Sequence, residues 1–199
     1  YADISFKESG AAATVEIIYN FLLANDWPIN AEMAKSILTG LLTDTGNFLY
    51  SNTNDKIAKI AAKMMLIGAR LPKIVRQTVT NKNLAVMHLW GLVLSRLKIN
   101  YEYLVAIATV KQKELSEFGL GVDDLTGLTG LMSGLQGVNG SLLLIETENG
   151  QIKGSLRSHL TNIDMSELAN FLGGGGHRQA AGFCVNGSLV EEGGQVIVS

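Results

Sequence analysis

Residues 173–183 form the run Gly-Gly-Gly-Gly-His-Arg-Gln-Ala-Ala-Gly-Phe, which combines backbone freedom with positive charge. Four consecutive glycines do not stabilise a helix or a strand, because each costs about 0.5–1 kcal/mol relative to Ala in either element. They suit a backbone that adopts positive φ or that brings bare N–H groups close to an anion. His177 and Arg178 add two cationic donors directly afterwards. The run therefore predicts a loop that holds a phosphate or phosphodiester group, with a flexible hinge before a buried strand as the alternative.

The same run resembles the signature of the DHH-associated domain of DHH-superfamily phosphoesterases, in their RecJ-like and oligoribonuclease-like branch. Two further stretches agree in order and spacing. Residues 42–48 (LTDTGNF) are similar to the last motif of the family's catalytic domain, and residues 154–158 (GSLRS) to the strand before the glycine-rich loop. The resemblance covers nearly the whole chain. It implies an α/β fold: the helical C-terminal part of a DHH catalytic domain at 1–72, a linker at 73–85, and a mixed-sheet DHH-associated, substrate-binding domain at 86–199.

The resemblance also implies which residues bind the substrate. In this family an arginine, a histidine and the glycine loop contact the phosphate. The matching positions here are Arg157, His177, Gly174, Gly175 and Gly176. An arginine suits this task because its planar guanidinium binds two phosphate oxygens at once. A surface ion pair with Asp164 is the alternative for Arg157, and proton transfer to a leaving group is the alternative for His177.

Asp44 lies where the resemblance places an aspartate that binds a divalent metal ion, Mn²⁺ or Mg²⁺. It is expected at the end of a helix that begins after Asn30, where the negative end of the helix dipole disfavours a carboxylate. A nearby cation, a hydrogen-bond network or a metal ion would compensate. From the tetrapeptide 43–46 alone, an Asx-turn is the alternative, with the carboxylate accepting backbone N–H groups. Beside the glycine-histidine run, we favour the metal ligand, and we predict that Asp44 faces that run across a cleft.

A complete two-metal site is missing from the sequence. Such sites need several carboxylates and imidazoles around two ions about 3.5–4 Å apart. The chain has one matching aspartate, Asp44, and contains neither an Asp-His-His triplet nor an Asp-x-Asp pair. The family places those motifs N-terminal to the region that resembles residues 1–10. We therefore expect the chain to be part of a longer phosphoesterase, to be inactive by itself, and to contain no catalytic residue beyond the binding groups named above.

The composition is that of a folded chain, 47% hydrophobic and 17% charged. Sixteen basic and 18 acidic residues give a net charge of −2. This balance argues against a general electrostatic grip on long nucleic acid and favours a short oligonucleotide or a dinucleotide as the ligand. Lys56, Lys59 and Lys63 share one helical face, which is interpreted as solvated surface.

The one cysteine, Cys184, excludes an internal disulfide and indicates a reducing compartment, so a cytoplasmic location is expected. Its neighbours are apolar, and it is expected to be buried. No apolar run approaches the ~20 residues that cross a bilayer, so no membrane partner is expected. Homodimer formation is left open.

The second half alternates strand and helix signals. The predicted strands are 89–94, 103–108, 140–146, 152–157 and 182–185. The first two are expected to pair through residues 98–100, and the third and fourth through a turn at 148–150. A helix opened by residues 162–164 is expected to end at the glycine run. This order predicts a mixed-sheet α/β domain.

The predicted function is a metal-dependent phosphodiesterase or exonuclease that hydrolyses short oligonucleotides or linear dinucleotides, by attack of metal-bound hydroxide. A non-catalytic nucleotide- or RNA-binding module is the alternative from another class. A structural α/β domain with a glycine hinge is the third. It predicts that nucleotide affinity is unchanged when Arg157 and His177 are replaced by Ala.

Overall fold

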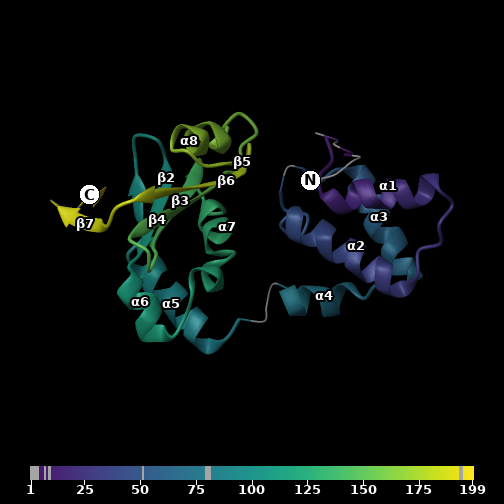
Figure 1. Ribbon diagram of the computed structural model, residues 1–199, viewed down its shortest axis with the longest axis horizontal. Helices are drawn as coiled ribbons and strands as arrows, with labels where there is room; N and C mark the ends of the chain where they lie inside the picture. Colours follow the sequence, from purple (N-terminus) through teal and green to yellow (C-terminus); the bar gives the residue numbers. More distant parts are fainter. Residues whose placement is uncertain (1–4, 7, 9, 51, 79–81, 193–194) are drawn as a thin grey trace. The chain divides into compact units, whose positions relative to one another are not determined.

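The chain folds into two compact units, residues 1–81 and 82–199. The computed structural model describes residues 5, 6, 8, 10–50, 52–78, 82–192 and 195–199 (Figure 1). The linker expected at 73–85 contains the end of a helix and the start of another, and its residues 79–81 lie outside the described part. The assignment of residues 1–72 to a catalytic domain stays a prediction.

The first unit is helical. Its helices are α1 (Thr14–Ala24), α2 (Ala31–Asp44), α3 (Asp55–Ile67) and α4 (Leu71–Thr78). The expected helix start after Asn30 is confirmed, because the Asn30 side chain accepts a hydrogen bond from the backbone N–H of Met33 at 2.9 Å. Asn54 caps α3 in the same way, by accepting from Ile57 at 3.0 Å. The most buried side chains of this unit come from α2 and α3: Leu38, Leu41, Leu42, Ile57 and Met64.

Glu16 is a buried carboxylate that joins α1 to α3. Its side chain is 3% exposed, accepts a hydrogen bond from the Ala12 N–H at 2.8 Å, and lies 2.7 Å from the Lys56 Nζ. The hydrogen bond from Lys56 to the Glu16 carboxylate raises the pKa of Lys56. Lys59 pairs with Asp55 on the exposed surface of α3. Two of the three lysines on this face therefore already have carboxylate partners.

The second unit is built on a six-stranded mixed sheet with the order β1-β2-β3-β4-β6-β5. The strands are β1 (Lys98–Asn100), β2 (Val105–Val110), β3 (Gly140–Glu146), β4 (Gln151–Arg157), β5 (Gly175–His177) and β6 (Ala180–Asn186). The β2–β3 pair is parallel and the other pairs are antiparallel. A separate hairpin follows, formed by β7 (Leu189–Glu192) and β8 (Gln195–Val198). The predicted mixed-sheet α/β class is thus confirmed.

Helices cover the sheet on both faces. They are α5 (Leu84–Ser95), α6 (Gln112–Phe118), the 3₁₀ turn η1 (Val122–Leu125), α7 (Leu128–Ser133) and α8 (Met165–Phe171). Successive side chains of a strand point to opposite faces. Leu143 and Ile145 of β3 pack with α5, α6 and α7, whereas Leu144 packs with α8. The layers are therefore helix, sheet and helix.

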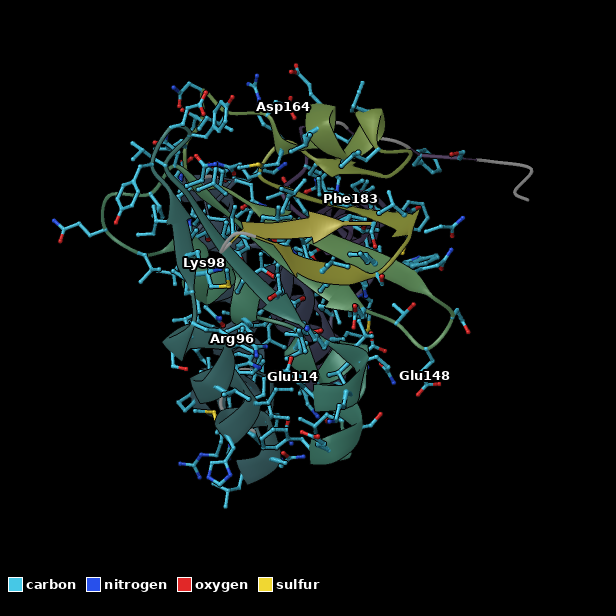
Figure 2. All side chains as sticks on the ribbon, turned by 90° about the vertical axis from the view of Figure 1, so that its left-hand side faces the viewer. Arg96, Lys98, Glu114, Glu148, Asp164 and Phe183 are labelled. Carbon is cyan, nitrogen blue, oxygen red and sulfur yellow. The ribbon has the colours of Figure 1, made fainter. Side chains whose placement is uncertain are left out.

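Figure 2 shows the two ends of this sheet. Arg96, at the end of α5, and Glu114 of α6 form an ion pair at one end, and Arg96 also donates to the Thr109 carbonyl at 2.7 Å. Asp164, at the start of α8, lies at the opposite end. The glycine-histidine run belongs to this opposite end, because it directly follows α8.

The strand expected at 89–94 is wrong, because these residues belong to helix α5. The Asn83 side chain accepts a hydrogen bond from the Val86 N–H at 2.8 Å and so begins a helix. Val86, Leu89 and Val93 are buried, at helical spacing. Residues 98–100, expected as a connection, are strand β1 instead.

Three further expectations concern the β3–β4 turn, Cys184 and the membrane. The β3–β4 hairpin is confirmed, with Gly150 at φ 67° in its turn. The expected burial of Cys184 is wrong, because its side chain is exposed. It follows the buried Phe183 on β6 and therefore points to the other face. Among the described residues, no helix is long and apolar enough to cross a membrane.

Candidate substrate-binding site

The glycine run forms a helix cap and a strand. Gly173 adopts φ 75° and ends α8. Its N–H donates to the Asn170 carbonyl at 3.0 Å, and the Gly174 N–H donates to the Ala169 carbonyl at 2.8 Å. These two bonds are the Schellman arrangement, in which a left-handed residue closes a helix. The three glycines implied as substrate ligands come directly after this cap.

Gly174, just before β5, and Gly176, within it, are required because their backbone packs closely on β6. A Cβ at Gly174 would lie 2.1 Å from the Gly182 carbonyl oxygen, and one at Gly176 would lie 2.6 Å from the Ala180 carbonyl oxygen. Gly176 also has φ 143°, which favours glycine. The small residues after the histidine thus form the surface that receives the glycine backbone.

Gly175 differs from both neighbours. The nearest atom to a Cβ built there is the Asn170 Oδ1 at 3.5 Å, an ordinary contact, and its φ is not positive. It pairs with Gly182, so two glycines lie opposite each other and leave the backbone bare. Among the described strands, β5 pairs with β6 on one side and lies at the edge of the sheet, so its other side presents backbone N–H and C=O groups that no described strand pairs with.

The register brings Arg157 and His177 onto one face of the sheet. Arg157 lies opposite Ala180 in the β4–β6 pair, and Ala180 lies opposite His177 in the β5–β6 pair. Directly opposed residues of antiparallel strands share a face. Neighbouring strands are 4.7–4.9 Å apart, so the Arg157 and His177 backbones are about 10 Å apart. A phosphate above the Ala180 methyl group is within reach of both side chains.

The two arginines near the run have different partners. The Arg178 Nε lies 3.3 Å from the Asp164 Oδ2. Arg157 donates to the Leu156 carbonyl at 2.9 Å and has no carboxylate partner among the described residues. The alternative pairing of Arg157 with Asp164 is therefore wrong. The hydrogen bond from the Ser166 hydroxyl, more than the neighbouring Arg178, lowers the pKa of Asp164, which keeps the carboxylate charged.

The hairpin that carries His177 is anchored on two sides. The Arg178 carbonyl accepts a hydrogen bond from the Met165 N–H at 2.7 Å, and the Gln179 carbonyl accepts one from the Ser158 N–H at 3.1 Å. The turn is thus fixed both to α8 and to the end of β4. The His177 side chain is exposed. A cationic or hydrogen-bonding group at the tip of a fixed turn is suited to a ligand that arrives from solvent.

Asp44 is the last residue of α2 and is exposed. Its carboxylate accepts no hydrogen bond from a residue that the structure describes, so the alternative Asx-turn does not form. The turn is closed by Thr45, whose hydroxyl accepts from the Phe48 N–H at 3.1 Å. Gly46, Asn47 and Phe48 follow in left-handed conformation, with φ of 57°, 60° and 66°.

Asp44 by itself does not make a metal site. Within the described ranges, no group of three or more His, Cys, Asp or Glu residues could hold a metal ion. One carboxylate supplies at most two of the roughly six ligands that Mg²⁺ or Mn²⁺ requires. Asp44 could therefore serve as one of several ligands of such an ion. It belongs to the first unit and the glycine run to the second, so the predicted cleft between them stays a prediction.

The family match covers the sheet and its glycine-histidine turn. Residues 100–196 match the model of the DHHA1 domain, and this range runs from the last residue of β1 into β8. These residues are a DHHA1 domain. The relationship to the DHH superfamily that the sequence suggested is therefore confirmed.

Curated relatives agree with this assignment. The chain is 32% identical over 189 residues to the "Bifunctional oligoribonuclease and PAP phosphatase NrnA" of Thermus thermophilus, a match that covers 94% of this chain and 55% of that protein. The protein of the same name from Bacillus subtilis is 28% identical over 185 residues, covering 92% and 58%. The chain thus spans about half the length of the curated relatives it matches.

A solved structure has the same fold. The exopolyphosphatase-related protein from Bacteroides fragilis superposes with a TM-score of 0.81 at 28% identity, over 92% of this chain and 54% of that one. The match extends through both units, so the helical first unit is part of the shared architecture as well as the DHHA1 domain.

Sequence reasoning missed how the DHHA1 domain holds its turn. The Arg178–Asp164 ion pair and the Gln179–Ser158 backbone bond are contacts between residues 14 to 21 positions apart, which no local pattern indicates. The strand character of Gly175–His177 was missed for another reason, because glycine has low strand propensity and its pairing is set by β6.

Proposed function

We propose that this chain binds the phosphate of a short oligonucleotide or linear dinucleotide, as part of a metal-dependent phosphodiesterase of the RecJ-like, oligoribonuclease-like type acting in the cytoplasm. The observation that carries the proposal is the row Arg157–Ala180–His177. In it, an arginine that pairs with no carboxylate of the described residues and an exposed histidine flank a methyl group. The names of the relatives, which refer to an oligoribonuclease and a phosphatase, support a phosphate-bearing nucleotide ligand.

Each group has a distinct part in this proposal. Arg157 binds two phosphate oxygens with its guanidinium, and His177 donates to a third. Gly175 leaves room for the phosphate to approach the edge of β5, where a backbone N–H that points away from β6 acts as an additional donor. Oriented donors of this kind hold the phosphate in place and stabilise charge that develops on it during hydrolysis.

Asp44 is proposed as one ligand of a Mn²⁺ or Mg²⁺ ion, whose chemistry when bound is to activate water as the nucleophile. The described residues supply too few further ligands for that ion. The chain by itself is therefore expected to bind nucleotide phosphates without hydrolysing them.

The direct test compares the two arginines. Affinity for a 5′-phosphorylated RNA dinucleotide is measured by calorimetry for the unaltered chain, Arg157→Ala and Arg178→Ala. Loss of a charge-assisted hydrogen bond is worth about 1.5–3 kcal/mol, so Arg157→Ala is expected to weaken binding about 10- to 150-fold. Arg178 already has a carboxylate partner, and its replacement is expected to change affinity by less than about threefold.

Two results would contradict the proposal. Equal affinities for the unaltered chain and Arg157→Ala would remove the arginine from the site. Robust hydrolysis of the same dinucleotide by the chain with Mn²⁺ would show that the metal site is complete, against the ligand count above.

A further inference from the structure

The loop between β1 and β2 exposes two tyrosines at the same end of the sheet as the proposed phosphate site. Tyr101 is 82% exposed and Tyr103 is 63% exposed. Aromatic side chains of this size usually bury much of their surface, so two of them in one short loop form an uncommon surface. Figure 1 shows this β1–β2 connection at the same end of the sheet as α8.

This loop is held in one conformation by two asparagines. The Asn100 Oδ1 accepts hydrogen bonds from the N–H groups of Glu102 and Tyr103 at 3.0 and 3.1 Å. Asn139 donates from its side chain to the Tyr103 carbonyl at 3.1 Å and from its backbone to the Leu104 carbonyl at 2.6 Å. Four hydrogen bonds thus fix the backbone that carries the tyrosines.

The backbone of the loop is also strained. Leu104 adopts φ 54°, a conformation that costs a residue with a Cβ roughly 1–2 kcal/mol. Such strain persists where the surrounding structure holds it, and it is frequent at ligand sites. A rigid, strained loop that displays aromatic rings loses little entropy when it binds a flat ligand.

Sheet register places this loop close to Arg157. Ala106, three residues after Tyr103, pairs with Ser141, and Ser141 pairs with Arg157. The two strand spacings between β2 and β4 amount to about 10 Å, and the three residues from Ala106 back to Tyr103 add at most about 10 Å along the chain. The direct separation is therefore about 10–14 Å, which corresponds to three to four nucleotides at the 3.4 Å spacing of a stacked strand. A short oligonucleotide held by a phosphate at Arg157 therefore reaches the tyrosines.

Hydrogen bonds connect the loop to the histidine turn. The Ser158 hydroxyl donates to the Asn139 carbonyl at 2.6 Å, and the Ser158 N–H donates to the Gln179 carbonyl at 3.1 Å. Asn139 holds the tyrosine loop and Gln179 belongs to the turn after His177. The two surfaces are thus parts of one hydrogen-bonded structure and keep a fixed separation.

Charge distinguishes what each surface can bind. Glu102 lies between the two tyrosines and repels a phosphate, whereas Arg157 attracts one. Aromatic rings stack on nucleobases irrespective of their sequence, because every base has a π-face. The loop therefore suits the bases of the ligand, and the Arg157 row suits its phosphate.

We propose that Tyr101 and Tyr103 form a base-stacking platform that makes the site selective for oligonucleotides over phosphate compounds without bases. This inference rests on the proposed function, since the phosphate held at Arg157 brings the bases to the loop. It assigns the tyrosines to binding and specificity, and to no chemical step.

The test uses two probes of equal length and charge: a 5′-phosphorylated RNA trinucleotide, and the same trinucleotide with abasic sugars. The chain is compared with the double variants Tyr101→Ala/Tyr103→Ala and Tyr101→Phe/Tyr103→Phe. The chain is expected to prefer the base-bearing probe. The alanine variant is expected to bind that probe about 5- to 150-fold more weakly and the abasic probe unchanged, and the phenylalanine variant is expected to retain the preference.

Other results separate this inference from the proposed function. Equal binding of both probes by the unaltered chain, each weakened by Arg157→Ala, would overturn the platform and leave the phosphate site standing. Binding of neither probe would overturn both. Thermal unfolding checks that the variants are folded, which is expected because both rings are exposed. If sedimentation shows that the alanine variant changes self-association and keeps its affinity for both probes, the loop is a protein interface and the platform is wrong.

Discussion

The same three strands, β4, β6 and β5, present two different faces. On one face Leu156, Ala181 and Phe183 are buried beneath α8. On the other, Arg157 and Gly182 are partly exposed and His177 is exposed. The residues that face α8 are buried, so the volume of each side chain decides which residue fits there. The residues of the open face are exposed, so their charge, or the lack of a side chain at Gly182, decides what they can bind. Alternation along each strand is what lets one stretch of sequence serve both purposes.

The largest expected effect concerns packing. Gly174→Ala places a methyl group 2.1 Å from the Gly182 carbonyl oxygen, so β5 has to move away from β6. Overpacking of this kind costs about 1–3 kcal/mol or more. Chemical unfolding in urea measures the loss.

Gly175→Ala is the matched control for that experiment, since the same methyl group meets its nearest atom at 3.5 Å. Its stability is expected to stay within about 0.5 kcal/mol of the unaltered chain. Equal destabilisation by the two substitutions would contradict the claim that close packing requires glycine at position 174 and permits a methyl group at position 175.

The second expected effect concerns the open face. Gly175→Ala covers the bare backbone beside His177, and loss of one backbone hydrogen bond to a charged phosphate oxygen lowers affinity about 10-fold. Calorimetric titration with a 5′-phosphorylated RNA dinucleotide measures it. An unchanged affinity in this folded variant would remove Gly175 from the ligand site.

The smallest expected effect concerns the anchor of the histidine turn. The pKa of Asp164 is lowered in the folded chain, mainly by the Ser166 hydroxyl and also by Arg178. A carboxylate with a lowered pKa contributes stability above its unfolded pKa and loses that contribution as the pH falls through the folded value. The contribution should therefore begin to decline near pH 4, the ordinary pKa of an Asp carboxyl, and be lost at lower pH.

Asp164→Asn isolates this contribution. Melting temperatures of the variant and the unaltered chain are expected to differ slightly at pH 7 and to converge as the pH falls below about 4 and Asp164 becomes protonated. A difference that stays constant, or that grows as the pH falls, would contradict the assigned role of this carboxylate.

Local signals predicted much of this fold. Asn30 is a helix cap because its side chain replaces a missing backbone acceptor, and Gly150 permits the β3–β4 turn; both effects act within a few residues. The strand wrongly expected at 89–94 shows the limit. A continuous apolar run fits a buried helix as well as a buried strand, and the cap at Asn83 decides for the helix.

The candidate site could be predicted in part. The residue types Arg157 and His177 were recognisable in the sequence, but their common face follows from the register of two strand pairs that involve Ala180. The same holds for Arg178, whose pairing with Asp164 depends on where α8 begins. Cys184 was misjudged because apolar neighbours suggested burial, whereas alternation after Phe183 directs it to the open face.

The most direct test of the central claim is a titration of the isotopically labelled chain with a 5′-phosphorylated RNA dinucleotide, followed by NMR amide shifts. If the Arg157–Ala180–His177 row binds the phosphate, the largest changes fall in residues 155–158 and 174–182. If they fall instead around the lysines of α3, at Lys56, Lys59 and Lys63, or if no amide moves, the row is not the phosphate site.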